Sequence, residues 1–305
     1  MTTVQAATNS LSKIRLDYLS DLFSLTKPRL SSLVIFTSAL GVFLAPGKIS
    51  FFQGLMSIAA TAGLVGGACV INCFMEKEID AKMERTKNRP LPSGRISGES
   101  ALTFGISLIV SCLLALFFLV NFLTGFLGLV AAVIYISLYT PLKRKTSWAL
   151  FAGAIPGAIP PLMGWTTVTN SFGVLGLIIF SILFVWQLPH FLSISIYHAE
   201  DYNNADIKTF PAHIGFKATS HRIAIYTLIL MLVSAAPAFF GLVSEGYSIG
   251  IYLLGGVFFI YSLFGHFYNE NSQEFRQWAR RYFYGSLIYL PITFTLMLYF
   301  RNGLN

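Results

Sequence analysis

Three oxygen-bearing side chains follow one another at a regular spacing at the end of an apolar stretch. Asn72, Glu76 and Asp80 stand four residues apart. On an α-helix this spacing keeps the three side chains within about 80° of arc, where they form one column. Hard divalent cations such as Mg²⁺ favour one or two carboxylates together with phosphate oxygens. The column therefore predicts one half of a site for a metal-bound phosphate.

The stretch that follows this column is basic. Arg85, Arg89 and Arg95 come within reach of the acidic residues. Fixed cations bind phosphate oxygens, and arginine does so through paired hydrogen bonds. An acidic column beside a basic loop suits a metal-bound diphosphate. Spacing alone equally allows a solvated helix beside the membrane, in which Glu78 and Lys82 form an ordinary intrahelical pair.

A second group of polar residues lies in and just after another apolar stretch. Gln187 and His190 flank Pro189, which is expected to kink the helix, and His198 and Asp201 follow at its end. Polar side chains at membrane depth are costly, and they usually face a cavity or a partner helix. The two histidines are eight residues apart and share a helix face loosely. Structural hydrogen bonding and ligand binding both remain open for them.

A third polar cluster runs from Tyr139 to Lys145 and ends an apolar stretch. Stop-transfer charge would be sufficient to explain it. In the next apolar stretch Pro156, Pro160 and Pro161 are expected to break the helix, and the neighbouring small residues allow close helix approach. Broken helices of this kind suit the wall of a cavity.

The composition is that of an integral membrane protein. Of the 305 residues 55% are hydrophobic and 11% are charged, whereas soluble domains carry roughly 25% charged residues. The three cysteines show neither a pairing pattern nor a metal-binding spacing, and we interpret them as packing residues. No cleavable signal segment is visible near the start. We expect a lead-in over residues 1–29, then a single membrane domain over residues 30–305.

Apolar stretches long enough to cross a bilayer set the fold class. A spanning helix needs about 20 largely apolar residues. The run from Ala101 to Leu142 is too long for one span, and Asn121 is expected to turn it. The fold class is thus an all-α polytopic bundle with nine transmembrane helices, predicted at Leu30–Ala45, Phe51–Phe74, Ala101–Val120, Phe122–Leu138, Trp148–Trp165, Phe172–Ile196, Ile223–Val243, Tyr247–Phe267 and Tyr282–Phe300.

The charged residues predict the orientation of this bundle. When loops are assigned to alternate sides, 19 of the 21 Lys and Arg fall on one side, and Lys48 and Arg301 remain on the other. The positive-inside rule then predicts a cytoplasmic N-terminus. This bias, together with anionic lipid headgroups of the bilayer, accounts for the net charge of +8, so no nucleic-acid partner is expected. Twelve of the thirteen Asp and Glu also lie on the cytoplasmic side, which that rule does not require.

The motif that opens with the acidic column resembles a known family. Asn72-xxx-Glu76-xxx-Asp80, read on to Arg95, resembles the first acidic motif of the UbiA-type intramembrane prenyltransferases. The pattern Trp-Gln-x-Pro-His over residues 186–190 narrows the resemblance to the protohaem IX farnesyltransferases, or haem O synthases. Further matches cover the chain nearly end to end: Thr26-Lys27-Pro28-Arg29, Tyr139-Thr140-Pro141-Leu142-Lys143-Arg144, Asp201-Tyr202 and Tyr289-Leu290-Pro291.

The resemblance implies a UbiA-type bundle around a central cavity that opens toward the cytoplasmic side. It implies farnesyl diphosphate as donor, Mg²⁺ as cofactor, and protohaem IX (haem B) as the acceptor substrate, with haem O as product for terminal oxidase biogenesis. The residues it implies are a metal and catalytic set of Asn72, Glu76, Asp80 and Asp201, with Tyr139 also catalytic; a diphosphate-binding set of Arg85, Arg89, Lys143 and Arg144; and His190 and His198 for haem.

Two departures from the family pattern bear on the metal site. Glu76 stands where the broader superfamily usually has Asp. The second loop offers Glu200, Asp201 and Asp206 in place of the superfamily's Asp-xxx-Asp column. The ligands contributed by this second loop therefore stay open.

Other functions were weighed against this one. A sibling prenyltransferase acting on a quinone precursor or chlorophyllide would share the first motif and the bundle. A secondary transporter would place its ionisable groups near the bilayer midplane and contain repeats. A non-catalytic scaffold would give no reason for acidic columns that face basic loops. We expect the chain in a bacterial cytoplasmic membrane rather than a mitochondrial one, with haem A synthase or oxidase assembly factors as candidate protein partners.

Overall fold

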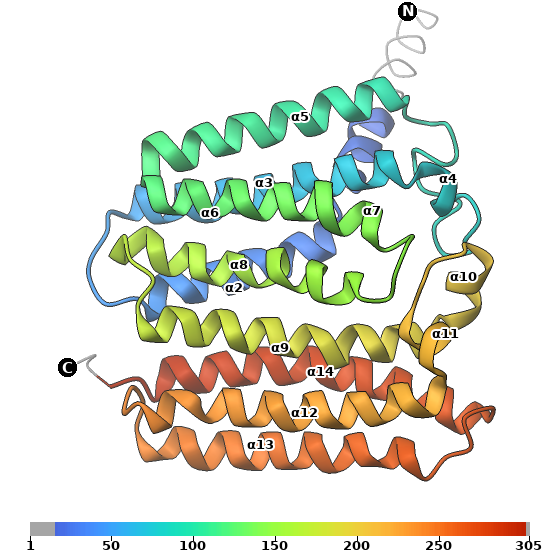
Figure 1. Cartoon of the computed structure of the whole chain (residues 1–305). Coiled ribbons are helices and arrows are strands. Elements are labelled where there is room, and N and C mark those ends of the chain that lie inside the picture. The colour runs from blue at the N-terminus through green and yellow to red at the C-terminus, as the bar shows by residue number, and fades with distance from the viewer. Residues whose placement is uncertain (1–15, 303–305) are drawn as a thin grey trace, which may run out of the picture.

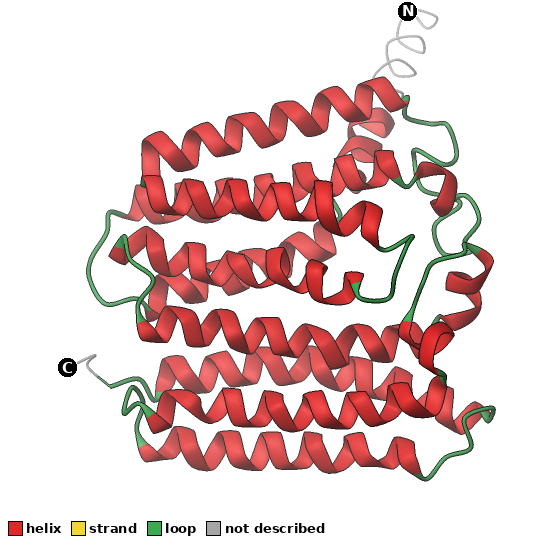
Figure 2. Ribbon diagram, viewed as in Figure 1, coloured by secondary structure: helices red, strands yellow, loops and turns green. Residues whose placement is uncertain are grey.

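Helices make up the regular structure of the chain. The computed structural model describes residues 16–302, and within them there is no strand beyond one isolated β-bridge between Val243 and Arg301. Figure 2 shows helices joined by loops throughout. The all-α prediction is confirmed. A helix over Leu16–Leu25 lies inside the predicted lead-in, whose residues 1–15 fall outside the described part of the chain.

Long helices lie side by side, and short helices gather at one end of them (Figure 1). The long elements are α2 (Pro28–Leu44), α3 (Phe51–Met75), α5 (Gly98–Ala115) with the π-helix η1 (Leu116–Val120), α6 (Phe122–Val133) with the π-helix η2 (Ile134–Tyr139) and α7 (Thr140–Leu142), α8 (Ala149–Thr169), α9 (Val174–Tyr197), α12 (Phe216–Phe239), α13 (Glu245–Leu263) with the 3₁₀ turn η3 (Phe264–His266), and α14 (Gln273–Tyr299). The short ones are α4 (Lys77–Asp80), α10 (Ala199–Asn204) and α11 (Phe210–Ile214).

The helices allow a count of candidate membrane crossings. Among the described residues seven helices are long and apolar enough to cross a membrane, or eight if Leu16–Leu25 and α2, which meet at 56°, form one span. Helix α8, with 21 residues and three prolines, is not among these seven. The count of nine therefore stays a prediction, as does the orientation, part of which rests on Lys13 and Arg15 outside the described residues.

The predicted turn at Asn121 is confirmed. This residue separates η1 from α6 with an extended backbone, and its side-chain oxygen accepts a hydrogen bond of 2.8 Å from the Thr124 backbone N–H. Its amide group donates to the Thr166 carbonyl of α8 at 2.9 Å. One side chain thus caps a helix and fastens the turn to a neighbour.

Helices α8 and α9 are continuous through their prolines, with Pro156, Pro160 and Pro161 inside α8 and Pro189 inside α9. The break expected in α8 is therefore absent, whereas the kink expected at Pro189 stays a prediction. A proline in a helix removes one donor, and packed neighbours can satisfy the acceptor that it frees. The two helices are also joined directly, since the Gln187 amide of α9 donates to the Ala154 carbonyl of α8 at 3.0 Å.

Helices α2 and α8 touch through their backbones. A Cβ added to Gly41 would lie 2.0 Å from the Pro161 carbonyl oxygen, and one added to Gly164 would lie 2.0 Å from the Ser38 carbonyl oxygen. Small residues at such positions let two helices approach closely inside a membrane. The two glycines therefore set the spacing of this pair.

The core of the C-terminal half is rich in buried tyrosines whose hydroxyl groups are all engaged. Tyr282 shares a hydrogen bond of 2.6 Å with Thr227. Tyr247 donates to the Ser234 carbonyl at 2.7 Å, and Tyr289 donates to the Ser234 hydroxyl at 3.0 Å. These bonds join α12 to α13 and α14. Because each buried hydroxyl is satisfied, the aromatic rings can pack at no polar cost.

Candidate active site

The two polar loops predicted from the sequence meet at one end of the bundle. Ile79 and Met83 of the first loop pack with Ala205 and Ile207 of the second, and Tyr202 covers this contact. Figure 1 shows α4 and α10 at the same end of the long helices. Asp80 and Asp201 consequently belong to one face of the molecule, as a shared site requires.

The acidic column exists, although it is not part of one straight helix. Helix α3 ends at Met75, and Glu76 adopts a non-helical backbone (φ −103°, ψ 7°) before α4. Four-residue hydrogen bonds continue across this break: the Glu76 N–H donates to the Asn72 carbonyl at 3.0 Å, and the Asp80 N–H donates to the Glu76 carbonyl at 2.8 Å. All three residues are buried, at 2%, 4% and 2% exposure for Asn72, Glu76 and Asp80.

Each buried carboxylate faces a cation. The Lys143 ammonium lies 2.6 Å from Glu76 Oε1, and the Arg89 guanidinium donates to Asp80 Oδ2 at 2.9 Å. Burial by itself lowers the pKa of Lys143, but Tyr139 and Glu76 outweigh it and raise that pKa above its ordinary value. Lys143 is therefore charged at neutral pH. The structure thus brings two of the predicted diphosphate-binding residues onto the predicted metal-binding column.

Asn72 is held from both ends of its carboxamide. Lys27 donates to Asn72 Oδ1 at 2.8 Å, and Asn72 Nδ2 donates to Thr140 Oγ1 at 3.2 Å. Lys27 is a functional contact that was not among the predicted site residues. The Thr26-Lys27-Pro28-Arg29 match contains it, as a cation directly before a helix that begins with proline.

The second loop supplies a looser arrangement. His198 Nδ1 lies 3.8 Å from Asp201 Oδ2, and the Arg85 guanidinium lies 6.0 Å from the centre of the Tyr202 ring. Burial, and next the charge of Arg85, lowers the pKa of His198 below its ordinary value. Burial raises the pKa of Tyr202. Both side chains are therefore neutral at pH 7.

The two histidines predicted to bind haem have different surroundings. His190 is buried in α9, and its Nδ1 shares a hydrogen bond of 2.7 Å with the Ser286 hydroxyl of α14. Its ring stacks on Trp186 at 4.5 Å and contacts Phe283 at 4.8 Å. His198 instead caps the end of α9 in a partly exposed position. The partner of His190 lies 96 residues away and could not be read from the sequence.

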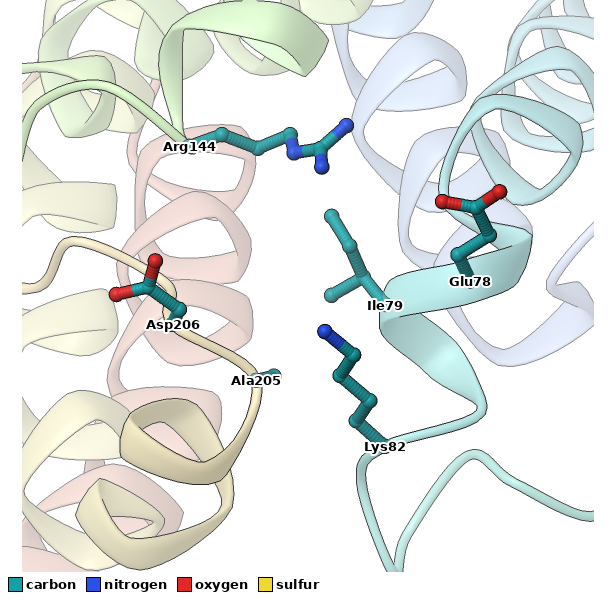
Figure 3. Close-up of a pocket in the computed structure, with 6 residues that line it drawn as sticks. All are labelled: Glu78, Ile79, Lys82, Arg144, Ala205 and Asp206. Atoms are coloured by element: carbon teal, nitrogen blue, oxygen red, sulfur yellow. The ribbon is translucent and has the colours of Figure 1, made fainter.

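Arg144 lines two cavities of about 230 Å³ each. One is bounded also by Met75, Glu76, Thr140, Pro141 and Lys145. The other is bounded by Glu78, Ile79, Lys82, Ala205 and Asp206, and Figure 3 shows the Arg144 and Lys82 side chains extending into the space between the two loops. Glu78 and Lys82 form no ion pair with each other in the described chain, so the simple intrahelical pair considered above is absent.

The donors at the column suit a hard cation that brings its own phosphate ligands. Within residues 16–302 no three His, Cys, Asp or Glu side chains lie close enough together to hold a metal ion. Glu76 Oε1 is buried and lies 2.6 Å from the Lys143 ammonium group in an ion pair. A carboxylate has about four lone-pair sites on its two oxygens, so Glu76 can pair with Lys143 and still offer a lone pair to a metal ion. Mg²⁺ commonly takes one or two carboxylates and completes its shell with water and substrate phosphate.

Comparison with known families and proteins agrees with this architecture. Residues 34–288 match the UbiA prenyltransferase family. The chain is 43% identical over 282 residues to a protein named protoheme IX farnesyltransferase from Anaeromyxobacter dehalogenans. The aligned region covers 92% of this chain and 94% of that relative. It is 44% identical over 278 residues to one of the same name from Myxococcus xanthus, covering 91% and 93%.

Two solved structures share the fold at low sequence identity. A digeranylgeranylglyceryl phosphate synthase superposes with a TM-score of 0.77 at 16% identity, over 93% of this chain and 98% of that one. A UbiA homolog from Archaeoglobus fulgidus bound to GPP and Mg²⁺ superposes with a TM-score of 0.63 at 15% identity, over 91% and 99%.

Proposed function

The chain belongs to the UbiA prenyltransferase family, and we propose that it transfers a farnesyl group from farnesyl diphosphate to a vinyl group of protohaem IX. The observation that carries this proposal is identity of 43% with a protein named protoheme IX farnesyltransferase along nine-tenths of both chains. The buried acidic column and its cations supply the chemistry that such a transfer needs. The product would be a farnesylated haem that serves terminal oxidases.

Mg²⁺ is the proposed cofactor, held by Asn72, Glu76 and Asp80 from the first loop and by Asp201 from the second. The bound ion would neutralise charge that develops on the departing diphosphate. Support comes from the buried column itself, which gathers two carboxylates and one amide oxygen, the donor types that Mg²⁺ prefers. The Archaeoglobus fulgidus homolog, which shares the fold, was solved with Mg²⁺ and an isoprenoid diphosphate.

Arg85, Arg89, Lys143 and Arg144 are the proposed diphosphate-binding residues. Lys143 and Arg89 already contact Glu76 and Asp80, so an incoming phosphate would meet each cation beside its carboxylate. Arg144 lines both cavities at this end, where it can reach a phosphate in either. Fixed cations of this kind stabilise the leaving group without rearranging during the reaction.

The residues around this site fit a dissociative transfer. The allylic C–O bond of the donor breaks, and its electron pair leaves with the diphosphate. The farnesyl cation is then attacked by the vinyl group, which forms a C–C bond; water adds to the resulting cation and releases a proton. The Tyr139 ring, stacked on Tyr135 at 5.4 Å, could stabilise positive charge beside the column.

His190 and His198 are the proposed haem contacts. A histidine that ligates iron usually has its other ring nitrogen hydrogen-bonded, and the bond between His190 Nδ1 and Ser286 fits that pattern. His198 is neutral at pH 7 and partly exposed, which also suits an axial ligand. Haem binding would be measured by the shift in haem absorbance that it causes. A shift that is lost in His190→Ala but kept in His198→Ala would assign the ligand to His190, and the reverse result would assign it to His198.

The proposed site faces the cytoplasm of a bacterial membrane. The relatives named above are bacterial proteins, and the described helices include seven long enough to span a bilayer. The concentration of lysine and arginine in the loops at the catalytic end supports a cytoplasmic location for that end. Haem A synthase or oxidase assembly factors remain proposed partners.

One experiment tests the reaction directly. Purified protein in detergent would be incubated with farnesyl diphosphate, Mg²⁺ and either haem B or a quinone precursor. The products would then be extracted and their masses measured by mass spectrometry. We expect a haem product heavier by one farnesyl group and one hydroxyl group. Farnesylation of the quinone precursor with no change in haem would refute the haem assignment and leave the prenyltransferase family intact.

A further inference from the structure

Lys27 occupies a disfavoured backbone conformation that no step above uses. Its φ of 53° and ψ of 64° place it in the left-handed region, directly before Pro28, which begins α2. A side chain on Cβ disfavours this region, and a residue that keeps it is held there by its surroundings. The conformation falls at the 56° bend between Leu16–Leu25 and α2.

The Lys27 side chain contacts the first residue of the acidic column, on the neighbouring helix α3. Its ammonium group donates to Asn72 Oδ1 at 2.8 Å, although the two residues are 45 positions apart. Asn72 Nδ2 then donates to the Thr140 hydroxyl at 3.2 Å, and that hydroxyl donates to the Tyr135 carbonyl at 2.8 Å. The chain of bonds joins the start of α2, the end of α3 and the start of α7.

The donors and acceptors in this chain allow only one orientation of the Asn72 carboxamide. A hydroxyl group has one hydrogen, and Thr140 donates it to the Tyr135 carbonyl. Toward Asn72 the Thr140 hydroxyl can therefore only accept a hydrogen bond. Asn72 must therefore present its NH₂ group to Thr140. A lysine ammonium group can only donate, so Lys27 must meet the Asn72 oxygen. The two ends agree, and the carbonyl oxygen keeps a second lone pair.

We propose that Lys27 is a positioning residue: with Thr140 it fixes the Asn72 amide oxygen at the head of the acidic column and thereby sets the affinity for a magnesium diphosphate. The inference rests on the proposed function for the choice of ligand, a magnesium-bound diphosphate. Outer-shell partners that orient metal ligands typically change metal affinity or activity by about 10- to 100-fold. Without Lys27 the amide loses the one cationic partner that it has within residues 16–302 and can turn away from the column.

The test measures binding of inorganic pyrophosphate to haem-free, full-length protein in detergent by titration calorimetry, with and without Mg²⁺. Lys27→Met removes the cation at similar length, and Lys27→Arg keeps a donor. Thr140→Val removes the acceptor at the other end of the amide. Lys87→Met is the matched control, because Lys87 is a lysine of the loop after α4 that pairs with the exposed Glu84 at 2.6 Å and makes no contact with Asn72 among the described residues.

We expect Lys27→Met and Thr140→Val each to weaken magnesium pyrophosphate binding by about 10- to 100-fold, with little effect on pyrophosphate alone. The double variant should bind no more weakly than the poorer single variant, since both act on one amide. Lys27→Arg should recover most of the affinity, and Lys87→Met should match the wild type.

Two results would overturn the positioning role. Unchanged affinity in Lys27→Met or in Thr140→Val would show that the amide orientation does not matter. An equal loss with and without Mg²⁺ that multiplies in the double variant would make Lys27 a direct phosphate contact instead. If Lys27→Met does not fold, the magnesium pyrophosphate affinities of Lys27→Arg and Thr140→Val still test the positioning role. Because no haem or farnesyl chain is present, a wrong acceptor assignment would leave the result unaffected.

Discussion

Removal of Lys143 should damage both folding and catalysis, and the two effects can be separated. The ammonium group lies 2.6 Å from Glu76, whose side chain is 5% exposed, while that of Lys143 is 19% exposed. Lys143→Met leaves the Glu76 carboxylate buried beside an apolar side chain. Glu76→Gln together with Lys143→Met removes both charges and leaves a neutral pair of similar size.

The expected cost follows from what remains buried. Breaking a buried ion pair from one side costs about 3–5 kcal/mol, because the other charge is left without compensation. Lys143 keeps some access to solvent, so we expect the lower value, about 3 kcal/mol. At about 2 °C per kcal/mol for a protein of this length, the melting temperature should fall by about 6 °C. The double variant should regain most of that loss.

The assay is thermal unfolding in detergent at pH 7.5, with turnover measured on the same samples. The Lys143 pKa is raised above 10.5, so the stability from its charge is complete below that pH and is lost only as the pH rises through the folded pKa. Lys145→Met serves as the stability control, since Lys145 is exposed. Both Lys143 variants should be inactive.

Equal melting temperatures for Lys143→Met and the double variant would refute this reasoning. Such a result would mean that Glu76 is not left as an uncompensated charge, either because it becomes protonated or because another cation replaces Lys143. Wild-type turnover in Lys143→Met would separately remove Lys143 from the diphosphate site.

Three further outcomes follow from the site. Asp80→Asn should lower turnover by about 100-fold or more while the protein stays folded, and undiminished turnover would remove Asp80 from the metal site. Chelation of divalent metal should abolish turnover, and added Mg²⁺ should restore it; activity that persists in chelator would exclude the proposed cofactor. The pKa of His198 is lowered from 6.5, so the folded state binds fewer protons than the unfolded state as the pH falls through that value. Melting temperature should accordingly drop between pH 7.5 and pH 5.5, and less so in His198→Gln; an identical drop in the variant would assign it to other groups.

The sequence was sufficient for the family, for the helices and for the two polar loops that meet at one end of the bundle. Long apolar stretches and the turn residue Asn121 act locally, so their outcome could be predicted and is confirmed. The acidic column was predictable for the same reason, because a four-residue spacing survives the break at Glu76. The number of crossings is harder to predict, since the proline-rich α8 is not among the seven helices that are long and apolar enough to cross a membrane.

Pairings between residues far apart in the sequence escaped prediction. Lys27 contacts a side chain 45 positions away, and His190 contacts one 96 positions away. Neither pairing can be read from residue spacing, because each depends on how helices are placed. The break expected at the prolines of α8 was wrong for a related reason: packing against neighbours, which a single segment does not reveal, lets α8 continue through them.

The seam between α2 and α8 has a mechanical consequence for the reaction. Where backbone meets backbone at Gly41 and Gly164, there is no side chain that could swing aside to absorb a displacement. Close backbone contact at two points favours a fixed separation of α2 and α8. Substitution of either glycine by a larger residue would therefore push the two helices apart, and with α2 it would displace Lys27 from Asn72.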